Sequence, residues 1–337
     1  MLKAAVIGVG AMGRHHARVY NELEDVELVA VADTDPQKTK LIGRRFKVPT
    51  YADYAQMLDK HQPEMLTVAV PTSLHRKVAT DVMRRGIHVL VEKPIASTVA
   101  EAEEMIQQAA AQGVQLAVGH IERFNPAVTE LKRQLDQGEL GQIFMVQARR
   151  MGPYPERIQD MGVVIDLAAH DIDVMFYLLG AKVERVYAET MRQVHPALED
   201  LLAGLVHFRN GVLGVLNINR LTPTKIRELS VTGDKGMFLV NYLTQDLFFY
   251  ENTRYERVPA AGEWENLGIL KGVAAGNMTR LAIPRKEPLR AEIEAFVQAV
   301  QGNPTAAVSG QDGLRVLELA LQLVEAGKRH TVLGGAR

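Results

Sequence analysis

The sequence predicts an α/β protein in which a doubly wound parallel sheet is followed by an α+β domain with a large, mostly antiparallel sheet. Over roughly the first 120 residues, short apolar runs alternate with stretches of helical spacing. Continuously apolar strands are typical of a parallel sheet that is covered on both faces. Later runs such as GVLGVLNINR alternate apolar and polar residues, and turn signals such as Arg209-Asn210-Gly211 join them. This second pattern favours an antiparallel sheet with one buried face.

Five apolar runs are expected to form the parallel strands, with four helices between them. The strands are expected at 2–8, 26–32, 65–70, 87–91 and 115–118, and the helices at 12–23, 36–46, 74–85 and 99–112. Right-handed crossovers make such a fold doubly wound, and its ligands bind beyond the carboxyl ends of the strands. A chain of 337 residues is long enough for two domains, which we expect at 1–121 and 122–337.

The composition excludes several classes of protein. The 39 Lys and Arg nearly balance the 40 Asp and Glu, so no excess charge favours nucleic acid or an acidic membrane. The absence of cysteine excludes a disulfide framework and thiolate ligands. The N-terminus lacks the features of a signal peptide, and no apolar run approaches the roughly 20 residues that span a bilayer. We therefore expect a mature cytoplasmic protein.

The first strand runs into GVGAMG, which predicts a dinucleotide site. Its glycines are Gly8, Gly10 and Gly13, which permit a tight turn, close approach of backbone to a pyrophosphate, and close helix packing, respectively. Asp33 ends the second strand 20 residues after the last glycine, where a carboxylate accepts hydrogen bonds from ribose hydroxyls and repels a 2′-phosphate. We expect NAD, contacted also by Ala11, Met12 and Thr34. NADP stays an alternative, because the cations Lys38, Lys40 and Arg44 follow Asp33.

The strand expected at 65–70 runs into VPTSLH, residues 70–75. Pro71 cannot extend the strand, Thr72 can cap the next helix, and His75 is expected in its first turn. These three residues are candidates for cofactor contacts, and a plain capped turn explains them equally well.

The strand expected at 87–91 stops at VEKPIA, where Glu92 and Lys93 precede Pro94. With a dinucleotide at the strand ends, Lys93 is expected near the nicotinamide, where its cation can bind a substrate hydroxyl. Pro94 fixes the backbone that follows the lysine. The alternative is a solvated Glu-Lys pair before a proline turn.

A second candidate site lies in GVVIDLAAHDIDVMFYLLG, whose apolar spacing predicts one helix ending at Gly180. Asp166 and His170 are four residues apart, so both lie on one face and the carboxylate can orient the imidazole. A histidine held in this way can act as a general base. A structural histidine and a metal site with Asp173 are alternatives, but a paired-histidine signature is missing and we expect no metal.

Together, GVGAMG, VEKPIA and DLAAHDID resemble motifs of the Gfo/Idh/MocA family, and the similarity extends to LRAEIEAFVQAV and SGQDGLRVLELALQLVEA. The resemblance implies an N-terminal Rossmann domain and a C-terminal domain, 122–337, that binds substrate and supports dimers or tetramers. It also implies that Lys93, Asp166 and His170 are catalytic and that Glu92 faces the cofactor ribose. Either Lys93 or His170 is then the proton acceptor.

The stretches GHIERFNPAV, RRMGPYPER and TPTKIRELSVTGDKGMFLVNYLTQDLFFYEN are similar to one branch of that family. That branch oxidises the 3-hydroxyl of UDP-N-acetylglucosamine or a related UDP-sugar, ahead of an aminotransferase. Cations in or near these segments suit a diphosphate, namely Arg123, Arg150, Arg157 and Lys225. The alternatives are a dehydrogenase of a free polyol such as inositol and a non-catalytic NAD-binding regulator.

Overall fold

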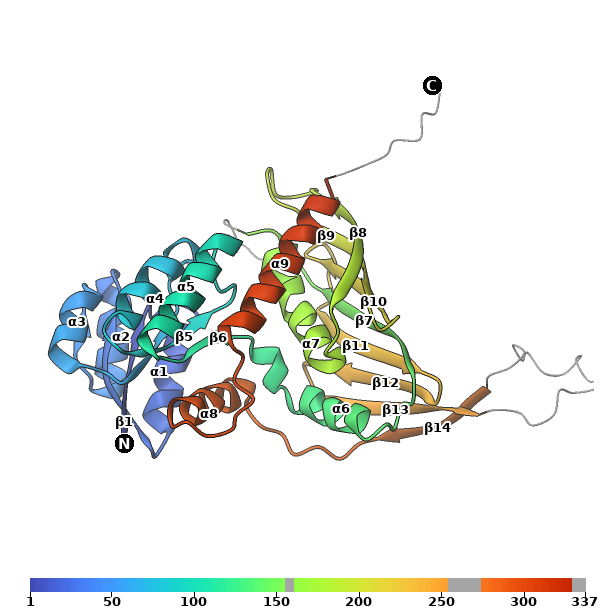
Figure 1. The fold of residues 1–337 in the computed structure, drawn as a ribbon, viewed down its shortest axis with the longest axis horizontal. Coiled ribbons are helices and arrows are strands. Elements are labelled where there is room, and N and C mark those ends of the chain that lie inside the picture. Colours follow the sequence, from blue (N-terminus) through green and yellow to red (C-terminus); the bar gives the residue numbers. More distant parts are fainter. Residues whose placement is uncertain (155–160, 254–273, 329–337) are drawn as a thin grey trace, which may run out of the picture. The chain divides into compact units, whose positions relative to one another are not determined.

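The computed structural model describes residues 1–154, 161–253 and 274–328 (Figure 1). The chain divides into two compact units, of which the first contains 1–124 and 286–321 and the second contains 125–285 and 322–337. This division differs from the expected domains, because a segment near the end of the chain returns to the first unit. Within the described ranges, no helix is long and apolar enough to cross a membrane.

The first unit is built on a parallel sheet with the strand order β3-β2-β1-β4-β5-β6. Its strands are β1 (Leu2–Ile7), β2 (Val26–Ala32), β3 (Thr50–Tyr51), β4 (Met65–Val68), β5 (His88–Glu92) and β6 (Leu116–Gly119). The chain runs outward from β1 to β3 and then crosses to β4, so β1 and β4 flank the switch point at which such sheets bind ligands. The predicted doubly wound parallel sheet is confirmed.

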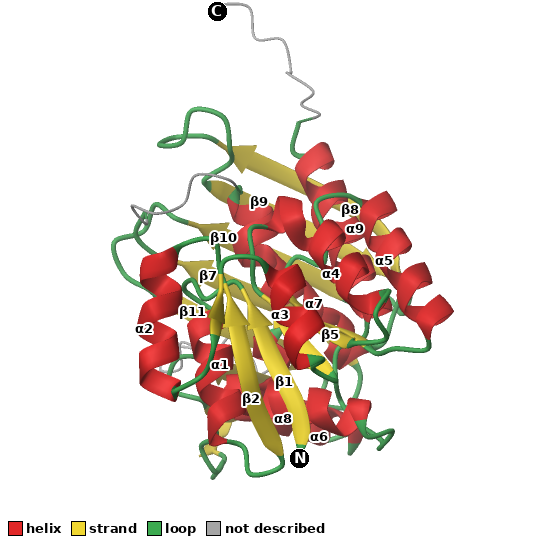
Figure 2. Ribbon diagram, turned by 90° about the vertical axis from the view of Figure 1, so that its left-hand side faces the viewer, coloured by secondary structure: helices red, strands yellow, loops and turns green. Residues whose placement is uncertain are grey.

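Helices cover both faces of this sheet, with α1 and α2 on one side and α4 and α5 on the other (Figure 2). The helices are α1 (Gly13–Glu22), α2 (Pro36–Phe46), α3 (Tyr54–His61), α4 (His75–Met83), α5 (Val99–Gln112), α8 (Pro288–Val300) and α9 (Gly310–Ala326), the last divided between the two units. Local signals set their ends: the Asp35 side chain caps α2 and the Thr98 side chain caps α5.

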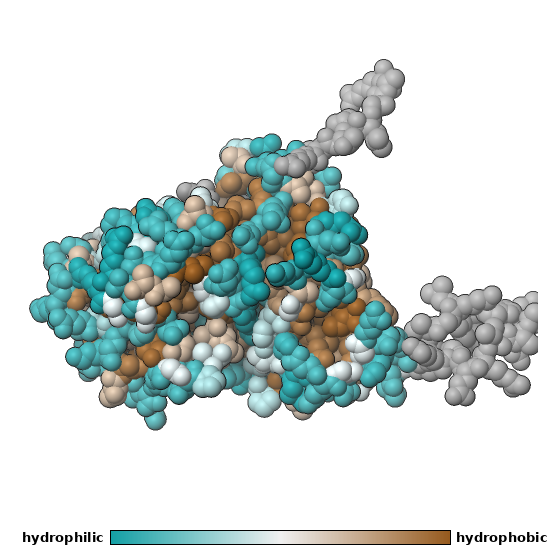
Figure 3. All heavy atoms as spheres, in the orientation of Figure 1, coloured by the Kyte–Doolittle hydropathy of each residue, from teal (hydrophilic) through white to brown (hydrophobic). Residues whose placement is uncertain are grey.

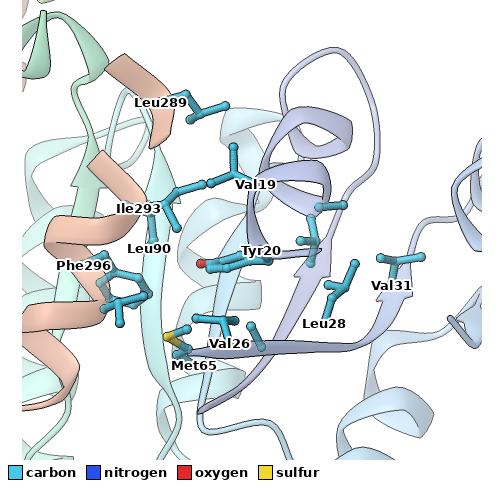
Figure 4. Close-up of a cluster of buried hydrophobic side chains, with 14 of the residues drawn as sticks. Val19, Tyr20, Val26, Leu28, Val31, Met65, Leu90, Leu289, Ile293 and Phe296 are labelled. Atoms are coloured by element: carbon cyan, nitrogen blue, oxygen red, sulfur yellow. The ribbon is translucent and has the colours of Figure 1, made fainter. Parts of the chain in front are cut away.

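The segment that returns to the first unit completes its core. Figure 4 shows Leu289, Ile293 and Phe296 of α8 lying against Val19 and Tyr20 of α1. The same cluster includes strand residues of β2, β4 and β5, namely Val26, Leu28, Val31, Met65 and Leu90. Burial of this apolar surface stabilises the sheet from the α1 side.

The second unit contains a sheet with the order β14-β13-β12-β11-β7-β10-β9-β8. Its strands are β7 (Ile143–Met151), β8 (Val183–Met191), β9 (Leu201–Phe208), β10 (Leu213–Asn219), β11 (Ile226–Gly233), β12 (Gly236–Asn241), β13 (Asp246–Thr253) and β14 (Ala274–Arg280), and its helices include α6 (Pro126–Asp136) and α7 (Ala169–Leu179). The pairs are antiparallel except for β7 with β10. Along β9, Leu202 and Val206 are buried whereas Leu205 is exposed, as the predicted one-sided sheet requires.

The predicted helix around Asp166 is interrupted. A π-helical turn, Val164–Ala168, precedes α7, which ends at Gly180 with φ +59°. Single π-helical turns often lie at functional sites because they shift the side chains that follow.

A buried ion pair fixes α7 to the sheet. Arg150 of β7 donates to Asp171 of α7 through Nε (2.6 Å) and Nη2 (3.1 Å), and both side chains are buried. The guanidinium also lies 5.1 Å from the ring centre of Tyr242. Two hydrogen bonds and a ring contact compensate the desolvation of these charges.

We expect Asp171→Ala to destabilise the protein by about 3–5 kcal/mol, because Arg150 then keeps a buried charge without its carboxylate. The matched control is Glu228→Ala, which removes the exposed 3.1 Å partner of the neighbouring Arg149 and should cost about 1 kcal/mol or less. Urea unfolding followed by circular dichroism compares the two variants. Equal losses would contradict the structural role assigned to the buried pair.

Candidate active site

The glycine turn after β1 is shaped by close backbone contacts. Gly8 has φ +87°, and a Cβ there would lie 2.4 Å from the Ala69 carbonyl oxygen. A Cβ on Gly13 would lie 1.8 Å from the Gly8 oxygen, whereas one on Gly10 would meet nothing within 4 Å. The turn therefore packs tightly at Gly8 and Gly13 and leaves open space over Gly10.

The start of α1 is suited to an anion. No side-chain hydrogen bond caps α1 at Met12, and Ala11 and Met12 are exposed. The first N–H groups of a helix lack partners within the helix and carry partial positive charge. The open space over Gly10 and this helix end together fit a pyrophosphate.

Asp33 directly follows β2, and its carboxylate binds backbone N–H groups of both the glycine turn after β1 and the turn before α2. Its Oδ2 accepts a hydrogen bond from the Val9 N–H (2.8 Å) and its Oδ1 accepts one from the Asp35 N–H (2.9 Å). The carboxylate is thus oriented beside the glycine turn, where a ribose is expected. Thr34 is exposed, and Lys38 forms an ion pair with Asp35 (3.3 Å), so this cation is already matched by a carboxylate.

Glu92 is the last residue of β5, and Lys93 follows it. The Lys93 N–H donates to Glu92 Oε2 (3.2 Å), and Glu92 Oε1 lies 2.9 Å from His16 Nε2 on α1. Burial alone acts to raise the pKa of Glu92, but the hydrogen bond from His16 and the charge of Lys93 hold that pKa below its ordinary value. Glu92 is therefore an oriented anion directly before the lysine.

His75 holds the backbone on the other side of Lys93. It is buried at the start of α4, with Nε2 2.9 Å from the Val70 oxygen and Nδ1 2.9 Å from the oxygen of Pro94, which follows a cis peptide bond. Burial lowers the pKa of His75 from its ordinary value, while the two carbonyls act in the opposite direction. The His75 ring thus contacts the backbone that follows β4 and β5 and supports it from inside. Of the other two predicted cofactor contacts in this turn, Pro71 is exposed and Thr72 is partly exposed.

In the second unit, Asp166 has an arginine partner that the sequence motifs did not indicate. Arg220, which follows β10, is buried and donates through Nη2 to Asp166 Oδ2 and through Nη1 to the Met161 oxygen (3.1 Å). Asp166 lies in the π-helical turn, and His170 lies in the first turn of α7 and is half-buried. In the described ranges, no three His, Cys, Asp or Glu residues are grouped as metal ligands.

A neighbouring loop supports the turn that carries Asp166. The Val164 N–H donates to Glu199 Oε1 (3.2 Å), and the Arg220 N–H donates to the Asp200 oxygen (3.0 Å). The Asp200 carboxylate accepts three backbone N–H bonds, from residues 193, 194 and 195. The buried Asp200 thus orders the loop that holds both Asp166 and its partner.

The predicted substrate arginines have different surroundings. Arg123, in the first unit, is buried and lies 3.4 Å from Asp312, and Arg150 is bound by Asp171 as described above. Arg157 lies outside the described residues.

Other basic residues gather at one end of β7, β10 and β11. Lys225 is exposed, and Arg227 donates to the Met151 oxygen (2.6 Å). A Cβ on Gly152 would lie 3.9 Å from the Arg227 guanidinium and 4.0 Å from Lys225 Cα. Arg220 follows β10 at this same end, so three basic residues lie near one group of strand ends.

Comparison with known families agrees with this geometry. Residues 2–120 match the Gfo/Idh/MocA oxidoreductase family, NAD-binding Rossmann fold, and residues 128–239 match the C-terminal domain of the same family. The chain belongs to the Gfo/Idh/MocA family. It is an NAD-dependent dehydrogenase of the type that acts on a CH–OH group of a sugar, and the predictions of family and cofactor are confirmed.

Several sugar and polyol dehydrogenases are similar to this member of the Gfo/Idh/MocA family over nearly its whole length. UDP-N-acetylglucosamine 3-dehydrogenase of Acidithiobacillus ferrooxidans is 27% identical, with 96% of each chain covered, and its solved structure has a TM-score of 0.84. D-glucoside 3-dehydrogenase of Escherichia coli is 28% identical, with 98% of this chain and 96% of that protein covered. Myo-inositol 2-dehydrogenase of Thermotoga maritima is 24% identical, with 97% and 96% covered.

The glycine turn provides a test of the cofactor site. We expect Gly10→Ala to fold normally but to bind NAD about tenfold more weakly or worse, because the methyl would take the space over the turn. Gly13→Ala should instead destabilise the chain by about 1–3 kcal/mol, because its Cβ would overlap the Gly8 oxygen. Calorimetric titration with NAD and thermal unfolding measure both effects. Unchanged NAD affinity in folded Gly10→Ala would place the pyrophosphate elsewhere.

Proposed function

We propose that the chain oxidises the 3-hydroxyl of UDP-N-acetylglucosamine, or of a related UDP-sugar, to the 3-keto sugar. The similarity to the Acidithiobacillus ferrooxidans enzyme, which covers 96% of both chains, supports this proposal, and the observation that carries it over a free sugar is the group of basic residues at the strand ends of the second unit. The candidate catalytic residues suit the reaction, since Lys93, Asp166 and His170 offer a cation, a carboxylate and an imidazole. Lys93 follows β5 in the first unit, and Asp166 and His170 lie in the π-helical turn and in α7 of the second unit.

The proposed chemistry moves one proton and one hydride. His170 accepts the hydroxyl proton on its imidazole, and Lys93 donates a hydrogen bond to the developing alkoxide. Asp166, held by Arg220, stabilises the positive charge that forms on His170. When bound, NAD supplies the acceptor for the hydride that leaves the same carbon.

The basic strand ends of the second unit support a nucleotide sugar as the substrate. Lys225, Arg227 and Arg220 gather where β7 and β10 end, although Asp166 already partners Arg220. Cations at such a position attract a diphosphate, and a guanidinium matches the geometry of phosphate oxygens. A free polyol lacks this anionic group and would make no use of Lys225 and Arg227.

A free sugar or polyol is the second candidate substrate. The D-glucoside and myo-inositol dehydrogenases are about as similar to this chain as the UDP-sugar enzyme is. The non-catalytic NAD-binding regulator is not retained, because the chain belongs to a family of sugar and polyol dehydrogenases.

We expect reduction of NAD with UDP-N-acetylglucosamine or its uronic acid, and no reduction with free N-acetylglucosamine, inositol or a simple glucoside. Absorbance of NADH measures turnover, with glutamate and a 3-keto-sugar aminotransferase present because oxidation of a secondary alcohol by NAD is uphill. We propose that such an aminotransferase also consumes the product in the cell. Turnover restricted to a free polyol or glucoside would favour the second candidate, and NAD binding without turnover on any of these compounds would contradict both candidates.

We expect Lys93→Ala and His170→Ala each to lower kcat/KM by about 10²–10⁴-fold, as loss of a proton-transfer or alkoxide-stabilising group does. Lys77→Ala is the control for loss of a lysine in the first unit, because Lys77 is largely exposed and pairs with Asp81 on the surface of α4. Steady-state kinetics with the active substrate compares the three variants. Full activity in both site variants would remove these residues from the mechanism.

We further propose that the chain forms a homodimer or homotetramer through the open face of the β8–β10 sheet. Tyr187, Leu205 and Val215 are paired across β8, β9 and β10, and Tyr187 and Leu205 are 61% and 42% exposed. Over α6 and α7, by contrast, polar side chains divide the apolar surface into separate patches (Figure 3). A second copy of the same flat face can cover this apolar row.

We expect Leu205→Glu to shift the native oligomer to a smaller species, because a carboxylate would then lie in the covered face. Leu243→Glu is the matched control, since Leu243 is 52% exposed in the turn between β12 and β13. Size-exclusion chromatography with light scattering measures the mass. A mass that both substitutions leave unchanged would exclude this face as the interface.

A further inference from the structure

A chain of buried side chains lies behind Glu92 and is not used by the proposed chemistry. His16 and Tyr20 come from α1 and Thr67 comes from β4, and all three are completely buried. His16 Nε2 lies 2.9 Å from Glu92 Oε1, and His16 Nδ1 lies 3.2 Å from Thr67 Oγ1. Thr67 Oγ1 lies 3.0 Å from the Tyr20 hydroxyl.

The tautomer of His16 with its proton on Nε2 gives these hydrogen bonds one consistent direction. Glu92 is ionised because His16 and Lys93 hold its pKa low against the effect of burial, so its Oε1 accepts and His16 Nε2 donates. In the neutral imidazole that carries its proton on Nε2, Nδ1 accepts from Thr67, whose oxygen accepts from Tyr20. Burial raises the pKa of Tyr20, which keeps its proton available for this bond. With the imidazole proton on Nε2, each group has the partner that its chemistry requires.

The two carboxylate oxygens of Glu92 connect the buried His16, Thr67 and Tyr20 side chains to Lys93. Oε1 accepts from His16, and Oε2 accepts from the backbone N–H of Lys93 at 3.2 Å. On β6, a Cβ at Gly119 would lie 3.3 Å from the Glu92 carboxyl group, so the carboxylate packs closely against that strand. The orientation of the carboxylate therefore fixes the backbone from which the Lys93 side chain projects.

We infer that His16 is a positioning residue for Lys93, acting by holding Glu92 as an oriented anion. His16 is fully buried and both of its ring nitrogens are bound, so it acts through Glu92 rather than on substrate. The inference rests on the proposed function in so far as Lys93 contacts the substrate hydroxyl. Its physical core, the state of His16 and Glu92, is independent of any substrate.

The charges that face Glu92 determine the pH dependence. The titratable groups around Glu92 are His16 from α1, Lys93 directly after β5, and His75 from α4, and of these Lys93 carries the positive charge. Loss of His16 removes the hydrogen bond that opposes burial, so the pKa of Glu92 should rise. Protonation of Glu92 would then begin at higher pH, and the acid limb of kcat/KM should move to higher pH.

Two substitutions separate the hydrogen bond to Glu92 from the volume of the side chain. In His16→Gln the amide nitrogen can take the place of Nε2 and still donate to Glu92, whereas the shorter side chain in His16→Asn places its amide near the position of Nδ1. His61→Gln is the control, because His61 is another histidine of the first unit and is bonded to Tyr51 (2.8 Å).

The first experiment uses the full chain without NAD or substrate. Nitrogen-15 NMR of the His16 ring should show the proton on Nε2, and carbon-13 NMR should follow titration of the Glu92 carboxyl, assigned with Glu92→Gln. We expect the pKa of Glu92 to rise in His16→Asn and to stay low in His16→Gln and His61→Gln. A proton on Nδ1 alone, or a Glu92 titration that is the same in all variants, would overturn the inference.

The second experiment measures kinetics with the active substrate. We expect kcat of His16→Asn to fall by up to about 100-fold, with the affinity for NAD nearly unchanged, the acid limb shifted to higher pH, and partial recovery in His16→Gln. Equal loss in both variants with an unshifted acid limb would indicate packing alone and overturn the inference. If NMR gives the expected states but wild-type protein oxidises no sugar, the proposed function fails and the assignment of His16 and Glu92 stands.

Discussion

Parallel strands end at the same edge of a sheet, and the cofactor residues of this chain depend on that edge. Gly8 follows β1, Asp33 follows β2, His75 follows β4, and Glu92 ends β5, although these residues are far apart in sequence. The edge stays compact because the glycine turn after β1 touches the backbone after β4 at Ala69. A side chain at Gly8 would separate β1 from β4 at the switch point, which is where the dinucleotide binds in this class of sheet.

Ion pairs and hydrogen bonds to charged groups give the candidate residues their orientation. A carboxylate or guanidinium removed from water is costly unless an opposite charge and hydrogen bonds replace the solvent. Glu92 has His16, Asp166 has Arg220, and Arg150 has Asp171. Each pair joins two elements, so the compensation of charge also fixes where one element lies on another.

Local signals predicted much of the first unit. The expected bounds of β2, α2 and α5 agree with the structure, since Asp35 and Thr98 cap the two helices and Gly113 follows α5 with φ +65°. The two-residue β3 and the eight-residue α3 were not predicted, because such short elements have too few residues to show a period. The π-helical turn before α7 has no local signature either, and the return of α8 to the first core depends on tertiary packing.

The candidate catalytic residues could be predicted from motifs, but their partners could not. His16 and Glu92 are 76 residues apart, and Asp166 and Arg220 are 54 apart, so strand order and register decide which side chains meet. On the sequence, His16 is simply a histidine two turns before the end of an amphipathic helix. In the fold it is the donor that lets a carboxylate remain ionised inside the protein. Loss of that donor should raise the pKa of Glu92, so Glu92 and His16 act as a single chemical unit that no local pattern contains.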